Sequence, residues 1–261
     1  MSVKIKNPEV KMNRTNISGI PVIELRPEVE IKGGVIFYHG WSSSKENQIF
    51  RASTIASHGY CVLVPDAAFH GNRGEIDYDD EEVLARYFFP ILIKSVRESE
   101  DLLNYFVDKL KVKKSFGVIG HSMGGFIAGG VIVADDRVNT MINVNGSCAW
   151  AKTRDLLLEE QGAAASPAKK ANLLNIEGEQ VDIENFDPYY NISKLAQRPI
   201  LMLHGEEDTS VPYVAQNYFY KKARKYYERE ENIKLELYEN LNHYFTTGML
   251  ESSIGWFNNN L

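Results

Sequence analysis

Short apolar runs alternate with longer amphipathic segments along most of this chain. Seven runs rich in β-branched and aromatic residues have the length and composition of buried strands. The segments between them carry apolar residues three and four apart, which is the spacing of surface helices. Strands that alternate with helices predict a parallel sheet covered by helices, and so an α/β fold. The predicted strands are Ile20–Leu25, Gly34–Tyr38, Tyr60–Pro65, Ser115–Ile119, Thr140–Val144, Ile200–Leu203 and Ile233–Tyr238.

Three of the intervening segments have clear helical patterns. The first is expected to begin with a capping box, because Ser43 precedes Glu46 by three residues. The third follows Pro212, a residue that suits the first turn of a helix. A weaker pattern over residues 2–12 predicts an additional edge strand. The predicted helices are Glu46–His58, Lys94–Leu110 and Tyr213–Arg229.

One region departs from this alternation. Residues 149–198 show no strand pattern, and Gly162–Pro167 has the composition of a break between two short helices. The region lies between the strands that end near Val144 and Leu203, where an insertion is most simply a lid or cap. No linker rich in Pro, Gly and Ser divides the chain. We therefore expect residues 1–261 to form a single domain with a helical cap insertion at about 149–198.

Composition and charge exclude several classes of protein. The chain has 261 residues, of which 44% are hydrophobic and 25% charged, enough for one large α/β domain. Its formal net charge is −6, so it lacks the basic excess of a nucleic-acid-binding protein. No signal peptide and no run of roughly 20 apolar residues are found, which predicts a cytoplasmic protein without a membrane partner. Cys61 and Cys148 lie in apolar surroundings and are expected to be buried thiols.

A G-x-S-x-G motif is the first candidate for chemistry. It runs from Gly120 through Ser122 to Gly124, after a predicted apolar strand and before a helix of small residues. In this setting the motif makes a sharp, strained turn that exposes the serine hydroxyl. The two glycines are required because side chains at their positions would collide in so tight a turn. The alternative, a glycine-rich turn without chemistry, does not explain the strand and helix around it. Ser122 is the predicted nucleophile.

A serine nucleophile needs a histidine base, which in this type of site follows the serine in the chain. Only His204 and His243 follow Ser122. His204 ends a predicted strand and precedes every nearby acid, whereas His243 lies in a loop after the last predicted strand. Catalytic groups of parallel sheets gather at the carboxyl ends of the strands. His243 is therefore the predicted base.

The acid that orients the base is expected between the serine and the histidine. Three carboxylates, Glu206, Glu207 and Asp208, follow the predicted strand that ends near Leu203. Asp208 is favoured because the Val-Pro pair after it begins the next helix and fixes the loop. Glu206 and Glu207 are interpreted as solvated loop charges, although either one remains an alternative acid.

Two backbone N–H groups are expected to stabilise the oxyanion that forms when the serine attacks. One is the N–H of Met123, the residue after the nucleophile. The other is predicted in the loop His39-Gly40-Trp41, which ends an early apolar strand, and is assigned to Trp41. For His39 itself, a hydrogen bond that braces the loop is preferred over a direct role in catalysis.

These segments together resemble the α/β-hydrolase superfamily, most of all its small bacterial carboxylesterases, which are similar to dienelactone hydrolases and to the catalytic domains of prolyl oligopeptidases. The resemblance implies a mostly parallel eight-stranded sheet with neither metal nor cofactor. The chain departs from true dienelactone hydrolases in having serine where they carry cysteine. The segments that carry the resemblance are Tyr38–Trp41, Asp66–Gly74, Gly120–Gly125, Asp187–Pro188, His204–Pro212 and Asn242–His243.

Three other segments have both a structural and a functional interpretation. His70 and Arg73 could contact a substrate, but a structural loop with Arg73 paired to an acid is favoured. The apolar run Arg86–Ile93 could line an acyl pocket, and core packing is the preferred explanation. The same holds for the adjacent Tyr189 and Tyr190.

The sequence therefore predicts a serine hydrolase that cleaves small or short-chain carboxylic esters through an acyl-enzyme. Its expected partner is a small acyl or ester substrate. A peptidase or amidase with the same triad is the first alternative. A catalytically silent binding protein with the hydrolase fold is the second, and an intact set of triad residues argues against it.

Overall fold

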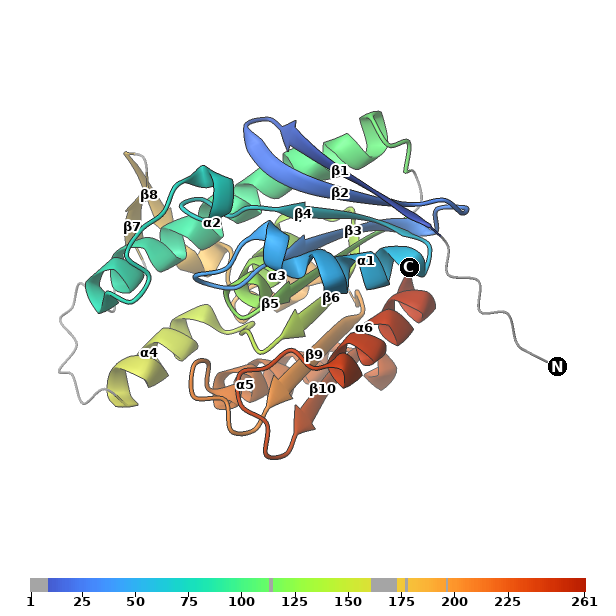
Figure 1. Cartoon of the computed structure of the whole chain (residues 1–261). Helices are drawn as coiled ribbons and strands as arrows, with labels where there is room; N and C mark the ends of the chain where they lie inside the picture. Colours follow the sequence, from blue (N-terminus) through green and yellow to red (C-terminus); the bar gives the residue numbers. More distant parts are fainter. Residues whose placement is uncertain (1–8, 113–114, 161–172, 177, 196) are drawn as a thin grey trace.

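The computed structural model describes residues 9–112, 115–160, 173–176, 178–195 and 197–261. Its centre is an eight-stranded sheet in the order β1-β2-β4-β3-β5-β6-β9-β10 (Figure 1). The β1–β2 and β2–β4 pairs are antiparallel, and every other pair is parallel, so the predicted mostly parallel sheet is confirmed. The strands of this sheet are β1 (Val10–Ile17), β2 (Ile20–Pro27), β3 (Gly33–Tyr38), β4 (Tyr60–Pro65), β5 (Phe116–His121), β6 (Val138–Val144), β9 (Ile200–Gly205) and β10 (Ile233–Tyr238).

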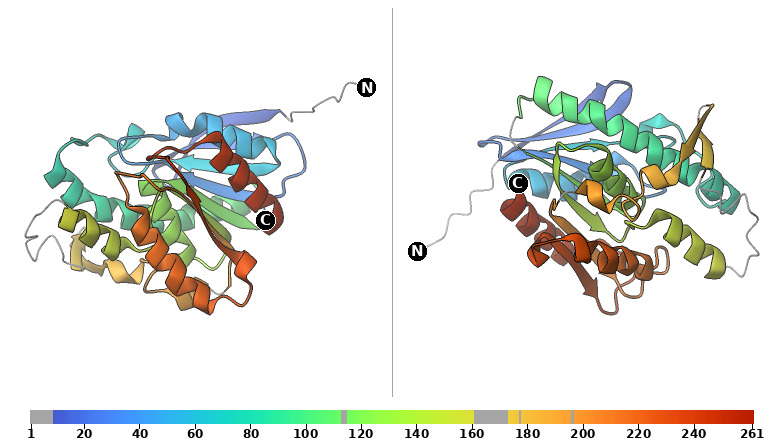
Figure 2. Two further views of the ribbon diagram at one scale, coloured as in Figure 1. Left: turned by 90° about the horizontal axis from the view of Figure 1, so that it is seen from below. Right: turned by 180° about the vertical axis from the view of Figure 1, so that it is seen from behind.

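Helices cover both faces of this sheet (Figure 2). Two of them, α1 and α6, bury their apolar residues against one face. Buried residues of α2, α3 and α5 belong to the core on the other face. The chain therefore forms three layers, with the sheet in the middle. The helices are α1 (Ile49–Ser57), α2 (Glu81–Asp108), α3 (Met123–Ala134), α4 (Trp150–Glu160), α5 (Tyr213–Ala223) and α6 (Thr247–Asn260).

All seven predicted strands exist, but the edge strand lies further along the chain than predicted. It is β1, which covers residues 10–17 rather than 2–12, and residues 2–8 of that prediction lie outside the described residues. A hairpin at Ser18 and Gly19, both with positive φ, pairs β1 with β2. Most of β1 is exposed, so its sequence lacks the alternation that would have marked its bounds.

The start of α1 differs from the prediction of a capping box. A short 3₁₀ turn, η1 (Lys45–Gln48), precedes the helix, and its N-cap residue Ser44 makes no capping hydrogen bond through its side chain. The Ser43 hydroxyl instead accepts hydrogen bonds from the side-chain amides of Asn47 and Gln48. The predicted capping box is therefore wrong, because the chain enters the helix through a tighter turn.

The second helix begins thirteen residues earlier than predicted, at Glu81 instead of Lys94. Asp80 caps it, with a side chain that accepts hydrogen bonds from the N–H groups of Glu82 and Val83. The earlier turns escaped the sequence pattern because Pro90, which lacks a backbone N–H, lies inside the helix. The predicted third helix also changes: α5 ends at Ala223 and continues as the 3₁₀ turn η5 (Arg224–Tyr226).

Residues 149–198 contain strands as well as the expected helix. After α4, the chain forms the antiparallel pair β7 (Leu173–Ile176) and β8 (Glu179–Asp182), beside α2 in Figure 1. The prediction of a region without strands is therefore wrong, because strands of four residues are too short to show a period. The predicted break at 162–167 lies outside the described residues. The 3₁₀ turns η3 (Ile183–Asn185) and η4 (Ile192–Leu195) follow β8.

Both cysteines are free and buried, as predicted. Burial raises the pKa of each thiol, Cys61 and Cys148, to about 12. Within the described part of the chain, no helix has the length and apolar character needed to cross a membrane.

Candidate active site

Ser122 occupies the sharp turn between β5 and α3. Its backbone has φ 57° and ψ −123°, a strained conformation for a residue with a side chain. A Cβ atom at Gly120 would lie 1.9 Å from the carbonyl oxygen of Gly124, and a Cβ atom at Gly124 would lie 2.2 Å from that of Tyr38. Both positions therefore exclude any side chain. The turn presents Ser122 at the carboxyl end of β5, where α3 begins.

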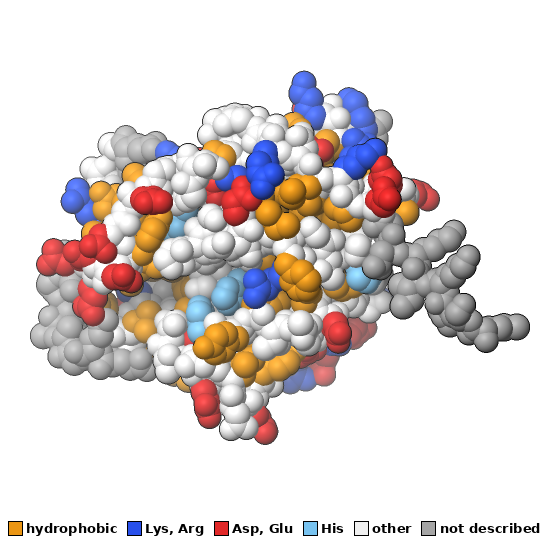
Figure 3. Space-filling model, viewed as in Figure 1, with side chains coloured by type: hydrophobic (Ala, Val, Ile, Leu, Met, Phe, Trp, Pro, Cys, Tyr) orange, Lys and Arg blue, Asp and Glu red, His pale blue; other side chains and the backbone are white. Residues whose placement is uncertain are grey.

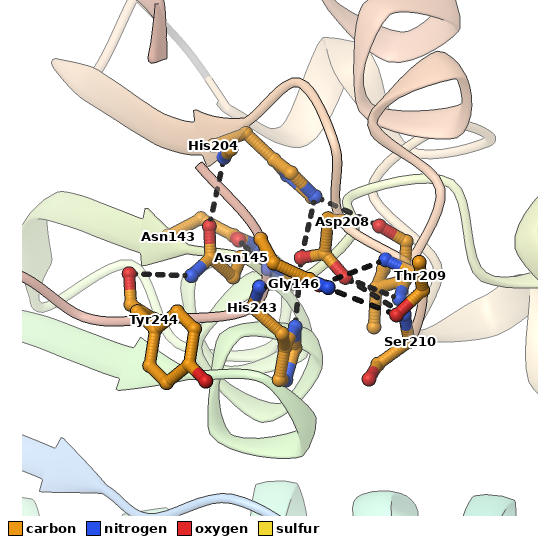
Figure 4. Close-up of polar contacts among 12 residues, drawn as sticks. Asn143, Asn145, Gly146, His204, Asp208, Thr209, Ser210, His243 and Tyr244 are labelled. Carbon is orange, nitrogen blue, oxygen red and sulfur yellow. Dashed lines mark hydrogen bonds and ion pairs between the residues drawn. The ribbon is translucent and has the colours of Figure 1, made fainter. Parts of the chain in front are cut away.

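Asp208 and His243 come together from two other strand ends (Figure 4). Asp208 follows β9 and His243 follows β10, and His243 Nδ1 lies 2.7 Å from Asp208 Oδ2. The second carboxylate oxygen, Oδ1, accepts hydrogen bonds from the backbone N–H groups of Ser210 and Val211 at 2.9 and 2.8 Å. The carboxylate is therefore fixed in orientation, with one oxygen turned to the imidazole.

The electrostatics of this pair favour an ionised Asp208. Burial by itself would raise the pKa of its carboxyl group. Hydrogen bonds from His204, His243 and the Val211 N–H outweigh burial and lower that pKa far below its usual value. The competing acids, Glu206 and Glu207, are exposed, in agreement with their interpretation as solvated charges.

The ring of His243 lies beside that of His121, the residue before the predicted nucleophile. The ring centroids of His121 and His243 lie 5.1 Å apart, and His121 immediately precedes Ser122. The space-filling view shows histidine side chains in a hollow of the surface, beside hydrophobic side chains (Figure 3). The residues predicted as nucleophile, base and acid thus lie at the carboxyl ends of three strands of one sheet.

The loop after β3 lies directly against the nucleophile. A Cβ atom at Gly40 would be 3.2 Å from Ser122 Cβ, so a side chain at this position would crowd the nucleophile. Within the described residues, neither the N–H of Trp41 nor that of Met123 has a hydrogen-bond acceptor. Met123 is the first residue of α3, where a helix leaves its N–H groups free. Both N–H groups predicted for the oxyanion hole are thus available.

His39 braces this loop. Its Nε2 accepts a hydrogen bond from the Ala67 N–H at 3.1 Å, so its Nδ1 carries the hydrogen and donates to the Gly40 carbonyl at 2.8 Å. The Gly40 carbonyl and the Trp41 N–H belong to one planar peptide unit and point in opposite directions. The ring of His39 therefore also fixes the direction of the Trp41 N–H.

We expect His39 to make the protein less stable in acid. Burial lowers its pKa to about 4, compared with about 6.5 in the unfolded chain. Between these two values the unfolded chain binds the additional proton, so the free energy of unfolding falls as the pH falls. His39→Gln keeps an acceptor for Ala67 but cannot bind the proton. Urea unfolding from pH 7 to pH 4 should therefore show a fall that is smaller in the variant by up to about 3 kcal/mol. An identical fall in both proteins would contradict this prediction.

Two asparagines join the loops that carry the acid and the base. Asn242 Oδ1 accepts hydrogen bonds from the backbone N–H groups of Thr209 and His243. Asn145 Oδ1 accepts from the Gly205 N–H, while its Nδ2 donates to the Tyr244 carbonyl (Figure 4). Asn145 lies outside the motifs identified in the sequence. Its positive φ of 47° is a conformation that asparagine adopts more readily than most residues, and the turn pair Asn145-Gly146 is the sequence signal that could mark it.

The loop after β4 is structural, as favoured from the sequence. Arg73 forms a two-fold ion pair with Glu98 on α2, at 2.7 and 2.6 Å. Asp66 is buried and pairs with the buried ammonium group of Lys45 at 2.5 Å. His70 is fully buried, with Nδ1 2.8 Å from the Ala68 carbonyl. The ion pair with Glu98 occupies the Arg73 guanidinium group, so Arg73 is not free to bind a substrate.

The apolar run at 86–93 divides between core and surface. Ile91, Leu92 and Ile93 are buried in the core, as predicted. Phe88 is only partly buried, and its ring lies 6.0 Å from that of Trp41 and 5.3 Å from that of Phe126. An aromatic surface therefore lies beside the loop after β3, which lies against Ser122.

Of the tyrosine pair, only Tyr189 packs against the core, whereas Tyr190 is 46% exposed. The core interpretation of Tyr190 is therefore wrong. Both rings instead contact the Lys222 ammonium group, whose distances to the ring centroids are 4.0 Å for Tyr189 and 5.8 Å for Tyr190. A cation accounts for the paired aromatic rings at this surface.

The sheet order and the strand-to-helix turn at Ser122 define a member of the α/β-hydrolase superfamily. More particularly, a model of the dienelactone hydrolase family matches residues 22–253, and the chain belongs to this family. The predicted class, a hydrolase of this superfamily related to the dienelactone hydrolases, is therefore confirmed.

Known proteins similar to the chain agree with this assignment. The putative esterase YitV of Bacillus subtilis is 29% identical over 95% of this chain and 98% of its own length. The crystal structure of TT1662 from Thermus thermophilus has a TM-score of 0.77 at 20% identity, covering 96% of this chain and 98% of that chain. Acylaminoacyl peptidase from Pyrococcus horikoshii gives 0.70 at 16% identity, covering 99% of this chain and 42% of that one. The two structural matches show the shared fold.

Proposed function

We propose that this protein hydrolyses carboxylic esters of small molecules, with Ser122 as nucleophile, His243 as base and Asp208 as the acid that orients the base. The single observation that carries the proposal is the 2.7 Å contact between His243 Nδ1 and Asp208 Oδ2, at strand ends beside the strained turn at Ser122. In the neutral imidazole this contact places the hydrogen on Nδ1, so that Nε2 can take the serine proton.

In the first half of the reaction, Ser122 Oγ attacks the ester carbonyl carbon while His243 Nε2 takes its proton. The carbonyl oxygen becomes an oxyanion, which the N–H groups of Trp41 and Met123 stabilise. The tetrahedral intermediate then collapses. The bond to the alcohol oxygen breaks, His243 returns the proton to that oxygen, and an acyl-enzyme remains on Ser122.

In the second half, water replaces the alcohol. His243 removes a proton from the water as it attacks the acyl-enzyme, and the same oxyanion forms again. Breakage of the bond to Ser122 Oγ, with return of the proton, releases the carboxylic acid. The buried and ionised Asp208 stabilises the imidazolium that forms in each half.

The similarity to a curated esterase supports an ester rather than an amide substrate. YitV, which matches over nearly all of this chain, is named a putative esterase. Amide cleavage in addition requires a proton for a poor amine leaving group. The aromatic surface formed by Trp41 and Phe88 provides apolar area for an acyl or alcohol group.

A substrate panel tests the proposal against its alternatives. We expect hydrolysis of p-nitrophenyl acetate and butyrate with a kcat/KM at least about a hundredfold above that for aminoacyl p-nitroanilides. Preferential cleavage of the anilides would assign the same site to a peptidase. Cleavage of neither class, together with no labelling by a fluorophosphonate, would indicate a silent binding protein.

A further inference from the structure

A second histidine contacts the same carboxylate oxygen as the proposed base. His204 lies in β9 and is fully buried. Its Nε2 is 3.2 Å from Asp208 Oδ2, the oxygen that His243 Nδ1 approaches at 2.7 Å (Figure 4). Asp208 Oδ2 therefore lies between two imidazole rings, one from the interior of the sheet and one from the surface loop.

The surroundings of His204 determine which of its nitrogens carries the hydrogen. Nε2 also lies 2.9 Å from the Val211 carbonyl oxygen, which can only accept a hydrogen bond. Nε2 must therefore be the donor, to Val211 and to Asp208 together. Among the described residues nothing partners Nδ1, which is buried. A hydrogen on that nitrogen would lack an acceptor, so the ring keeps its single N–H at Nε2.

We infer that His204 is a positioning residue for the hydrolytic reaction: its Nε2–H holds Asp208 Oδ2 in line with His243 and shares the negative charge of that oxygen. This inference rests on the proposed function, because it gives Asp208 the role of orienting acid. His204 touches neither the substrate nor the reacting atoms. It acts through Asp208 alone.

A positioning role of His204 predicts an effect on the pH dependence of the reaction that a purely structural role would not. A carboxylate that loses one of its donors accepts more strongly from the donor that remains. Without the His204 N–H, Asp208 would stabilise the protonated form of His243 more strongly. The acidic limb of the kcat/KM profile should move upward.

A substitution at His204 leaves the other charged and titratable groups around this site in place. His121 faces His243 from the turn at Ser122, with burial lowering its pKa to about 3. Arg51 on α1 lies over the ring of Phe245, two residues after His243, and donates to its carbonyl. The backbone donors to Asp208 Oδ1 remain as well. A change at His204 thus alters one contact of the carboxylate.

Two amide substitutions distinguish the nitrogens of His204. In His204→Gln the side-chain amide reaches the position of Nε2, whereas in His204→Asn it reaches only that of Nδ1. We expect the Asn variant to lower kcat about tenfold with KM changed less than about twofold, and to move the acidic limb upward by about half a pH unit. In the Gln variant, kcat and the position of the acidic limb should both stay close to those of the wild-type protein. His58→Gln, at an exposed histidine on the far end of α1, is the matched control and should change neither.

A double-mutant cycle separates action through Asp208 from bracing of the loop. If His204 acts through the carboxylate, adding His204→Asn to Asp208→Asn should lower kcat by less than about a further twofold. Equal kcat values and unmoved acidic limbs in the His204→Asn and His204→Gln variants would overturn the inference. A kcat about tenfold lower in the double variant than in Asp208→Asn would overturn it as well. Full activity of Asp208→Asn alone would instead overturn the proposed function, so the two failures are distinguishable.

Discussion

Ser122→Ala is expected to lower kcat for p-nitrophenyl butyrate by about 10⁵-fold or more, to the level that binding and the oxyanion N–H groups alone can support. The serine hydroxyl forms the covalent bond of the proposed reaction, and an alanine side chain has no atom that can form it. Alanine tolerates the positive φ at position 122 about as well as serine does. The variant should therefore fold, which its thermal unfolding midpoint checks.

The outcome that contradicts this prediction is retained turnover. A folded Ser122→Ala protein with more than about one per cent of the wild-type kcat would show that another group performs the hydrolysis. His58→Ala, far from the site in an exposed position, serves as the control for preparation and assay. It should keep the full rate.

Asp208→Asn is expected to lower kcat about 10⁴-fold with little change in KM. The asparagine amide would present to His243 Nδ1 either an N–H or an uncharged oxygen, which is a weaker acceptor than the carboxylate. The imidazole would therefore lose its fixed tautomer and the stabilisation of its protonated form. Both backbone donors to Asp208 Oδ1 can still be accepted by the remaining amide oxygen. The effect should therefore appear in kcat before it appears in folding.

Glu207→Gln is the matched control for this variant, because Glu207 is exposed and adjacent to Asp208. It should leave the steady-state constants unchanged. If Glu207→Gln lost activity and Asp208→Asn kept it, the acid would be Glu207, one of the alternatives that the sequence left open.

The central strands could be predicted because they are buried on both faces. Every residue of β3, β4 and β9 is buried, and such strands appear in the sequence as continuous apolar runs with clear ends. The exposed edge strand β1 and the four-residue strands β7 and β8 leave no such signal. Helix bounds failed where local chemistry overrides the period, at Pro90 and at the 3₁₀ turn before α1.

The candidate active site likewise has parts that the sequence predicts and parts that it does not. Ser122 and its glycines form a local motif, and the order of Ser122, Asp208 and His243 along the chain follows from the strand ends on which they lie. The contacts of His204, Asn145 and Asn242 cannot be predicted from local sequence. The asparagine contacts depend on where a distant loop returns in space, as in the hydrogen bond from Asn145 to the Tyr244 carbonyl, 99 residues away. His204 and Asp208 are only four residues apart, but their 3.2 Å contact depends on how the loop after β9 turns, which no periodic pattern marks.

The most direct test of the proposed nucleophile is covalent labelling. We would treat the protein with a fluorophosphonate and locate the adduct by mass spectrometry of tryptic peptides. The account predicts one adduct per chain, on Ser122 within the peptide Ser115–Arg137, and no adduct in Ser122→Ala. An adduct on a different residue, or equal labelling of Ser122→Ala, would contradict it.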